Sequence, residues 1–126
     1  MMEIQIKFDK SGRIVPFFKG AEITMNESPF LIFLATAGMC SAVFVRSFMQ
    51  QRGLPFEEVG ITQKMNYDRI TNVVSDIDMV VDLPVNFPEK YVSAIKNVIA
   101  QCPVKRHLAE PPTFNVIANL SPILEK

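Results

Sequence analysis

The fold is decided by the stretch SPFLIFLATAGMCSAVFVRSFMQQRG, which runs from Ser28 to Gly53. A serine side chain can cap the free backbone amides at a helix start, proline fits the first helical position, and glycine suits the left-handed residue after the end. Ser28, Pro29 and Gly53 stand in these three places. The stretch therefore predicts one long helix over residues 29–52.

This helix carries no charged residue between Phe30 and Val45. A membrane span is the first alternative, but the uncharged run reaches only about 24 Å as a helix, which is shorter than the apolar layer of a bilayer. Thr36, Gly38 and Ser41 also interrupt it. We therefore predict a core helix and no membrane contact. A helix that is apolar on every side is covered by a sheet or by a second subunit.

Short strand patterns flank the long helix. Residues 3–8 alternate between apolar and polar side chains, and short strands are predicted over 13–18 and 21–24. Two further strands follow the helix, and aspartates on the opposite face of the second one predict an antiparallel sheet with one solvated face. The apolar faces of these two strands are predicted to carry Ile61, Met65 and Tyr67 on the first, and Val73, Ile77, Met79, Val81 and Leu83 on the second.

Prolines divide the C-terminal third of the chain. A second helix is predicted from about Pro88, with an apolar stripe that includes Ile95 and Ile99. Cys102 should break it, because a residue before a proline is pushed out of the helical region, and Pro103 should start a short third helix through Leu108. The final pattern predicts one more strand, in which Phe114, Val116, Ala118 and Leu120 alternate with their neighbours.

Together these elements predict a single α+β domain over residues 1–126, with an antiparallel sheet packed against the long central helix and a second helix. The long helix is apolar on all sides, and one small sheet can cover only one of them. A homodimer that buries this helix is therefore expected.

Composition narrows the function classes. The chain has 126 residues, and 13 Lys plus Arg balance 13 Asp plus Glu, so it lacks the positive field on which nucleic-acid binding depends. The first residues alternate charged and apolar side chains, unlike an export signal, so a cytoplasmic protein is expected. Two cysteines and one histidine do not make a four-ligand zinc site within one chain, and no metal is expected.

Cys40 lies in the middle of the long helix between small residues such as Gly38 and Ala42. Their small size leaves room beside the thiol for a second side chain or a small substrate. The alternative is that Cys40 packs as a buried small hydrophobe, which is how free cysteines commonly behave.

Cys102 precedes a helix that begins at Pro103, so its sulfur is expected among unpaired backbone amides at the positive end of the helix dipole. Lys105, Arg106 and His107 add positive charge nearby. The alternative is a cysteine packed at a chain reversal, with these basic residues in solvent.

The two thiols together suggest peroxide chemistry. A peroxide-reducing thiolate becomes a sulfenic acid, which needs a second thiol at a Cα separation of about 4.4 to 6.8 Å if it is to escape further oxidation. Cys40 and Cys102 meet that demand if the second helix packs beside the first.

The residues around both cysteines resemble a known family. Ser28-Pro29-Phe30-Leu31 through Ala37-Gly38-Met39-Cys40-Ser41-Ala42 resembles the Pro-to-Cys helix of the OsmC/Ohr proteins, and the segment Cys102-Pro103-Val104-Lys105-Arg106-His107-Leu108 is similar to their second-cysteine motif. The resemblance implies an intertwined homodimer with two active sites at its interface, which reduces organic hydroperoxides and hydrogen peroxide, with Cys40 as the peroxidatic residue and Cys102 as the resolving one. It also implies re-reduction by a dithiol, such as a lipoylated protein, and no metal or organic cofactor.

One position departs from the family. Peroxidatic members carry a Glu directly after the helix-starting proline, and this Glu pairs with an arginine that holds the thiolate. Here that position is Phe30, and Arg13 is the only arginine in the N-terminal region. Less electrostatic help is therefore available to lower the pKa of Cys40.

Three functions follow as hypotheses. The first is a thiol-dependent peroxidase, for which an apolar lining from Phe30, Phe33 and Phe44 would favour an apolar hydroperoxide. The second is a non-catalytic protein that binds an apolar ligand or senses oxidation, which Phe30 favours. The third is a structural dimer with two inert thiols.

Overall fold

One antiparallel sheet and a helical layer build the chain in the computed structural model, which describes residues 1–120. The sheet has the strand order β3-β2-β1-β4-β5, and the predicted α+β class is confirmed. Along the chain the elements are β1 (Met2–Phe8), β2 (Ile14–Phe18), β3 (Ala21–Glu22), α1 (Pro29–Gln51), β4 (Gly60–Asp68), β5 (Val73–Asp82), the 3-10 turn η1 (Glu89–Tyr91), α2 (Val92–Ile99) and α3 (Pro103–Ala109).

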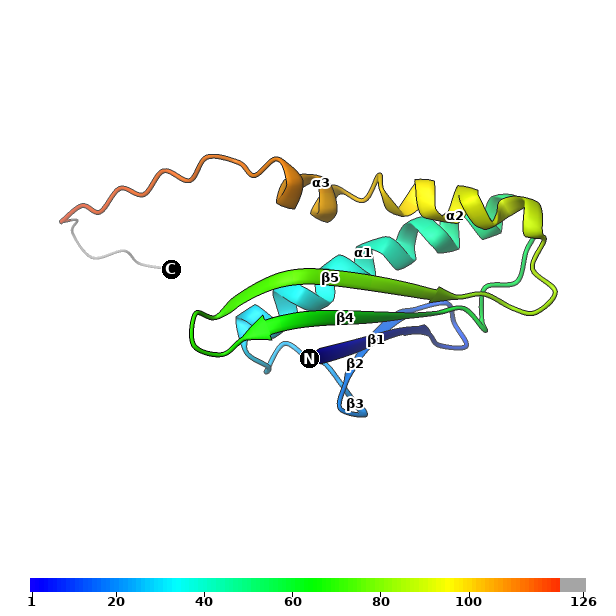
Figure 1. Cartoon of the computed structure of the whole chain (residues 1–126), viewed down its shortest axis with the longest axis horizontal. Helices are drawn as coiled ribbons and strands as arrows, with labels where there is room; N and C mark the ends of the chain where they lie inside the picture. The colour runs from blue at the N-terminus through cyan, green and yellow to red at the C-terminus, as the bar shows by residue number, and fades with distance from the viewer. Residues whose placement is uncertain (121–126) are drawn as a thin grey trace.

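The long helix α1 lies across one face of the sheet, and α2 and α3 follow one another along α1 (Figure 1). Its first half packs with β1 and β4 in one apolar cluster, which includes Ile4, Ile61 and Met65. Its second half packs with α2 in another cluster, which includes Val45 and Ile95. By length and composition alone α1 could cross a membrane, but these contacts make it the core helix of the domain.

The predicted ends of α1 are confirmed. The Ser28 hydroxyl accepts a hydrogen bond from the Leu31 backbone N–H at 3.2 Å, and Pro29 is the first helical residue. At the other end Gly53 has a φ of 65°, and the Leu54 N–H donates to the Met49 carbonyl at 2.9 Å. This left-handed glycine ends the helix, as the sequence predicts.

Gly38 brings α1 close to the sheet. A Cβ atom at this position would lie 2.8 Å from Ile6 Cγ1 and 2.9 Å from Gln63 Oε1, which is closer than real side chains come. Gln63 is fully buried, and its Nε2 donates to the Leu34 carbonyl at 2.9 Å. Within residues 1–120 its Oε1 has no hydrogen-bond partner. The glycine therefore sets the depth at which the helix sits.

A β-bulge near the start of β5 reverses the faces predicted for its first residues. The strand pairing places Asn66 opposite Asp76 but Tyr67 opposite Val74, so β5 carries one extra residue at this point. Because side chains alternate along a strand, the extra residue reverses the faces beyond it. Val74 consequently packs on the core and Val73 is exposed, so the predicted inward position of Val73 is wrong.

The predicted last strand, from Phe114 to Leu120, is also wrong within the described chain. Residues 111–120, here called the C-terminal arm, have no strand assignment and are all exposed. The arm leaves α3 and runs away from the rest of the domain, so neither edge of the sheet is beside it (Figure 1). An apolar alternation forms a strand only where a partner strand can supply its hydrogen bonds.

Candidate active site

The two cysteines come from different elements and lie close together. Cys40 is in the middle of α1, and Cys102 is the residue just before α3, with an extended backbone (φ −56°, ψ 125°) because Pro103 follows. Both are free thiols. Cys40 is partly exposed, whereas Cys102 is 0% exposed. The structure therefore brings together the two predicted site residues and gives them different access to solvent.

Burial and two neighbouring residues, Cys102 and Val104, shift the pKa of Cys40. Burial raises the pKa of its thiol, and a hydrogen bond with the Cys102 side chain raises that pKa further. A hydrogen bond from the Val104 backbone N–H lowers it. The amide at the start of α3 thus acts on Cys40, although the sequence predicted its effect on Cys102. On balance the pKa of Cys40 is raised, which favours the thiol over the thiolate.

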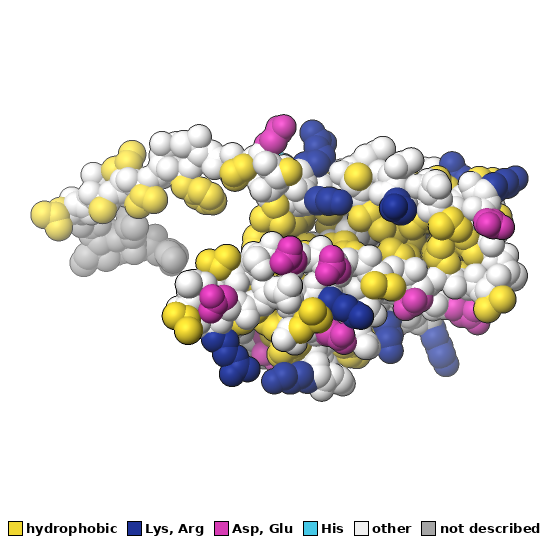
Figure 2. Space-filling model, in the orientation of Figure 1, with side chains coloured by type: hydrophobic (Ala, Val, Ile, Leu, Met, Phe, Trp, Pro, Cys, Tyr) yellow, Lys and Arg dark blue, Asp and Glu magenta, His cyan; other side chains and the backbone are white. Residues whose placement is uncertain are grey.

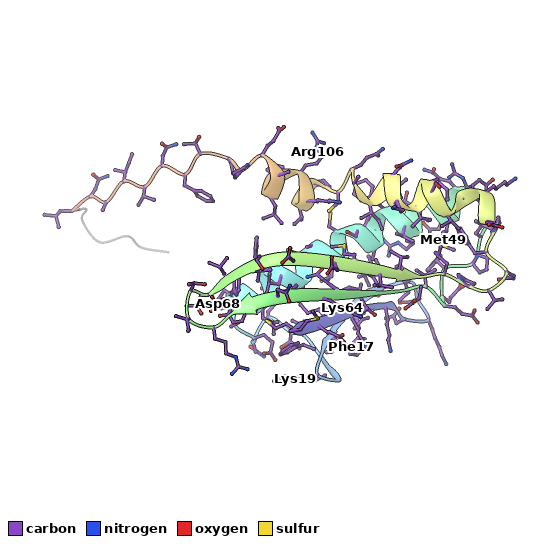
Figure 3. All side chains as sticks on the ribbon, viewed as in Figure 1. Phe17, Lys19, Met49, Lys64, Asp68 and Arg106 are labelled. Carbon is purple, nitrogen blue, oxygen red and sulfur yellow. The ribbon has the colours of Figure 1, made fainter. Side chains whose placement is uncertain are left out.

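The basic residues of α3 do not supply charge to Cys40. The groups that act on its pKa in the described chain include no Lys, Arg or His. Arg106 points away from α1 and the sheet (Figure 3). The His107 Nδ1 atom lies 2.6 Å from the Pro103 carbonyl within the same helix. The sequence placed this basic cluster near Cys102, where its effect stays a prediction; it does not act on the pKa of Cys40.

An apolar cavity of about 490 Å³ lies between α1, α3 and the C-terminal arm. Thr36 in its wall is one helical turn from Cys40, and Val104 in the same wall is the amide donor to Cys40. Two neighbours of Cys40 therefore line the cavity, although Cys40 itself is not in its wall. Its walls are formed by Phe33, Thr36, Pro103, Val104, His107, Leu108, Pro111, Pro112 and Phe114.

The sequence predicted only part of this cavity. Phe33 lines it, and Phe30 stacks on Phe33 with ring centroids 6.2 Å apart, but Phe44 is not part of the wall. Thr36 and Val104 were missed. The signal for Thr36 is its spacing of four residues from Cys40, which places both on one side of a helix. Nothing in the sequence pairs Val104 with Cys40.

The sequence model of the OsmC-like protein family matches residues 25–117, a segment that includes both cysteines and α1. The chain belongs to the OsmC-like protein family. No curated protein matches the sequence significantly. The fold of this OsmC-like protein is similar to the crystal structure of a candidate osmotic stress induced and detoxification response protein from Psychrobacter arcticus 273-4. The TM-score is 0.56 at 13% identity, over 84% of this chain and 87% of the other.

This OsmC-like protein has no charged clamp at its cysteine pair within residues 1–120. Phe30 occupies the position of the clamp carboxylate and contacts Phe33 and Tyr67. Arg13 pairs with Asp9 at 3.1 Å and with Glu22 at 3.6 Å, so it is engaged elsewhere. The pKa of Cys40 is raised by burial first and then by Cys102.

Proposed function

We propose that this OsmC-like protein is a thiol-dependent peroxidase that reduces organic hydroperoxides through Cys40 and Cys102. The observation that carries the proposal is the pairing of a partly exposed thiol with a fully buried one beside an apolar cavity. The exposed sulfur can meet a peroxide, while the buried sulfur is protected from the same oxidant. This division suits a peroxidatic and a resolving cysteine.

The reaction divides into three steps. The Cys40 thiolate attacks the terminal peroxide oxygen, so that an S–O bond forms, the O–O bond breaks, and the leaving alkoxide takes a proton to become an alcohol. The Cys102 sulfur then attacks the sulfenic sulfur of Cys40, and water leaves as the disulfide forms. A dithiol reductant, of which a lipoylated protein is one example, restores both thiols by exchange. No metal or organic cofactor takes part in these steps.

The Val104 amide has a defined part in the first step. Its N–H donates to the Cys40 sulfur and favours the thiolate, against the opposite effects of burial and Cys102. Because the charged clamp is missing, this neutral hydrogen bond is the stabilising contact that the described chain offers. We therefore expect slower peroxide reduction than a clamped site would give.

Intact mass after one equivalent of cumene hydroperoxide tests the proposal. Wild type should lose about 2 Da as the disulfide forms, and Cys102→Ser should gain about 16 Da as Cys40 becomes a sulfenic acid. Cys40→Ser should show neither change. Unchanged mass in wild type, or equal peroxide consumption by wild type and Cys40→Ser under dithiol, would reject the proposal.

A second candidate is a non-catalytic protein that senses oxidation or binds an apolar ligand. The raised pKa of Cys40 and the phenylalanine at the clamp position favour it. Turnover separates the two functions. A peroxidase consumes many equivalents of hydroperoxide per subunit with a dithiol present, whereas a sensor stops after one.

We also propose that the active form is a homodimer in the cytoplasm, where reducing conditions keep both thiols free. Hydrophobic side chains follow the C-terminal arm on the molecular surface (Figure 2), and Val116 is 91% exposed. Strand β5 is an edge of the sheet with unpaired backbone groups. If the arm of one copy paired with β5 of a second copy, the apolar side chains of the arm would be covered and the free backbone groups of β5 would gain hydrogen-bond partners.

Sedimentation tests this assembly. The full chain should sediment as a dimer, and Val116→Asp should shift it toward monomer because a carboxylate would enter the paired segment. Val85→Asp is the matched control, since Val85 is also fully exposed but lies outside the arm. A monomeric wild type, or equal effects of the two substitutions, would contradict the proposal.

A further inference from the structure

Another cavity, of about 620 Å³, lies at the end of the sheet where β1 begins and β2 and β4 end. These three strand ends meet because β1 is antiparallel to both of its neighbours. Phe17 and Lys19 are in the wall and lie across the sheet from α3 (Figure 3). The cavity shares no lining residue with the one beside Cys40, and the proposed peroxide reaction does not use it.

Two cationic side chains of the wall, Lys19 and Arg69, are available to an anion. Neither makes an ion pair within residues 1–120. The neighbouring Asp68 carboxylate accepts hydrogen bonds from the backbone N–H groups of Ile70 at 2.9 Å and Thr71 at 3.5 Å, so it stabilises the turn after β4. A phosphate monoester carries up to two negative charges near neutral pH, and it therefore matches two such cations better than a singly charged carboxylate does.

Lys19 takes a backbone conformation that is uncommon for lysine. Lys19 and Gly20 form the two-residue loop between β2 and β3, because Phe18 pairs with Ala21, and their φ angles are 53° and 81°. Asn, Asp or Gly is the usual first residue of such a loop, since other side chains are unfavourable in the left-handed region. Unfavourable backbone conformations cluster at ligand sites. The loop thus places an ammonium group in the cavity wall at an energetic cost.

Aromatic rings form another part of the wall. Phe17 and Tyr67 both line the cavity, and both are partly exposed. The Tyr67 hydroxyl donates a hydrogen bond to the Asn72 side-chain oxygen, which holds the Tyr67 ring in place. Nucleic-acid bases stack on exposed aromatic rings of this kind, because every base has a flat face.

The β1 side of the wall is polar and includes Glu3 and Gln5. Their side-chain oxygens can accept hydrogen bonds from the hydroxyl groups of a sugar, as an acidic residue does for the ribose in dinucleotide-binding folds. Glu3 lies opposite Lys64 in the pairing of β1 with β4. This lysine reduces the repulsion that the Glu3 carboxylate would exert on a bound anion.

We propose that this cavity is a binding site for a mononucleotide. The phosphate would lie at the two cations, the ribose hydroxyls at Glu3, and the base against Phe17. The volume of about 620 Å³ is within the range of small-molecule sites. A nucleic-acid chain is not expected, because 13 Lys plus Arg balance 13 Asp plus Glu. The proposal does not depend on the proposed peroxidase function.

Three related probes separate the contributions of phosphate and base. Adenosine monophosphate has a base, a ribose and a phosphate, whereas adenosine lacks the phosphate and ribose-5-phosphate lacks the base. Titration of the full chain, followed by backbone amide NMR shifts, measures each Kd and locates the site. Adenosine monophosphate should bind with the lowest Kd. Its largest shifts should fall at Lys19, Gly20 and Arg69.

Substitutions should affect the probes selectively. Lys19→Asn should raise the Kd of both phosphates by about two- to fivefold, as expected for one partly exposed ion pair, and leave that of adenosine unchanged. Asparagine suits the left-handed turn, so the fold is retained. Phe17→Leu should raise the Kd of both base-containing probes by about fivefold or more and leave that of ribose-5-phosphate unchanged. Lys10→Gln is the matched control, because it removes one positive charge beyond the opposite end of β1.

Circular dichroism verifies that each variant is folded. Absence of adenosine monophosphate binding at millimolar concentration would overturn the proposal, as would a Kd equal to that of adenosine or of ribose-5-phosphate. Equal effects of Lys10→Gln and Lys19→Asn would also overturn it, because general charge attraction would then explain the binding. Largest shifts at Phe33 and Val104 would place the ligand in the cavity beside Cys40 and contradict the proposed site.

Discussion

The two sides of α1 serve different purposes although their sequences look alike. The side that faces the sheet carries Leu34, Ala35, Ala42 and Val45, all almost completely buried, and Gly38 in close contact with the strands. The other side carries Phe33, Cys40 and Val43, which are partly or largely exposed. One apolar helix thus anchors the core and also carries the partly exposed thiol of Cys40.

This difference indicates that the stability of the fold and the chemistry of the Cys40 thiol depend on separate contacts of the same helix. Substitutions toward the sheet should change the free energy of unfolding with little effect on the chemistry of Cys40. Substitution of a group that acts on Cys40 directly should change that chemistry, whereas a distant substitution on the exposed side should change neither that chemistry nor unfolding by much. Three predictions, in decreasing order of expected effect, test this separation.

Gly38→Ala should have the largest effect, on stability. The new Cβ would approach Ile6 and Gln63 within 3 Å, so overpacking should lower the free energy of unfolding by about 1 to 3 kcal/mol. Urea denaturation followed by circular dichroism measures the change. Val43→Ala, on the exposed side of the same helix, is the control and should cost much less. A gain of about 1 kcal/mol, as alanine gives at an open helical glycine, would contradict the close contact.

Cys102→Ala should change the pH dependence of Cys40. The hydrogen bond with Cys102 raises the pKa of Cys40, so removing it should shift the midpoint of iodoacetamide alkylation to lower pH. The rate should still increase with pH, because the thiolate is the nucleophile. Burial remains in the variant, and it is the largest cause of the raised pKa. A midpoint that stays in place or rises would show that Cys102 does not hold the proton on Cys40.

Phe30→Glu should have the smallest effect, although it restores the family residue. Ten residues of helix separate positions 30 and 40, a distance of about 15 Å, which exceeds the screening length of about 8 Å at physiological salt. Without an arginine between them, the carboxylate should change the alkylation rate of Cys40 by less than about twofold. Alkylation at pH 8 in 0.15 M salt measures it. A larger change would mean that a charged group connects the two positions.

Local sequence signals predicted most of the fold. Ser28, Pro29 and Gly53 define α1 because capping and left-handed glycines act over a few residues. The face of Val73 could not be predicted, because the bulge in β5 depends on pairing with β4. The last strand was wrong for a similar reason: alternation in the C-terminal arm indicates a strand but does not supply its partner.

The candidate site was predicted only in part, because local sequence signals do not show which distant segments meet. The two cysteines were named from their local settings and the family resemblance, and the fold brings them close together. The effect of the Val104 amide on Cys40 was not predicted, because the direction of a helix start relative to a neighbouring helix leaves no trace in spacing. The cavity walls combine α1, α3 and the arm, which lie far apart in the sequence.

The unequal burial of the two sulfurs also fixes which of them a reductant can reach. Thiol exchange requires an incoming thiolate to approach one sulfur of the disulfide in line with the bond that breaks. Cys102 is completely enclosed, so the attack on a Cys40–Cys102 disulfide must come at Cys40, with Cys102 as the leaving thiol. In the proposed reaction the mixed disulfide with the reductant would therefore form on α1, at the sulfur that is also proposed to meet the oxidant. Oxidant and reductant would use one entrance in turn and exclude each other from it.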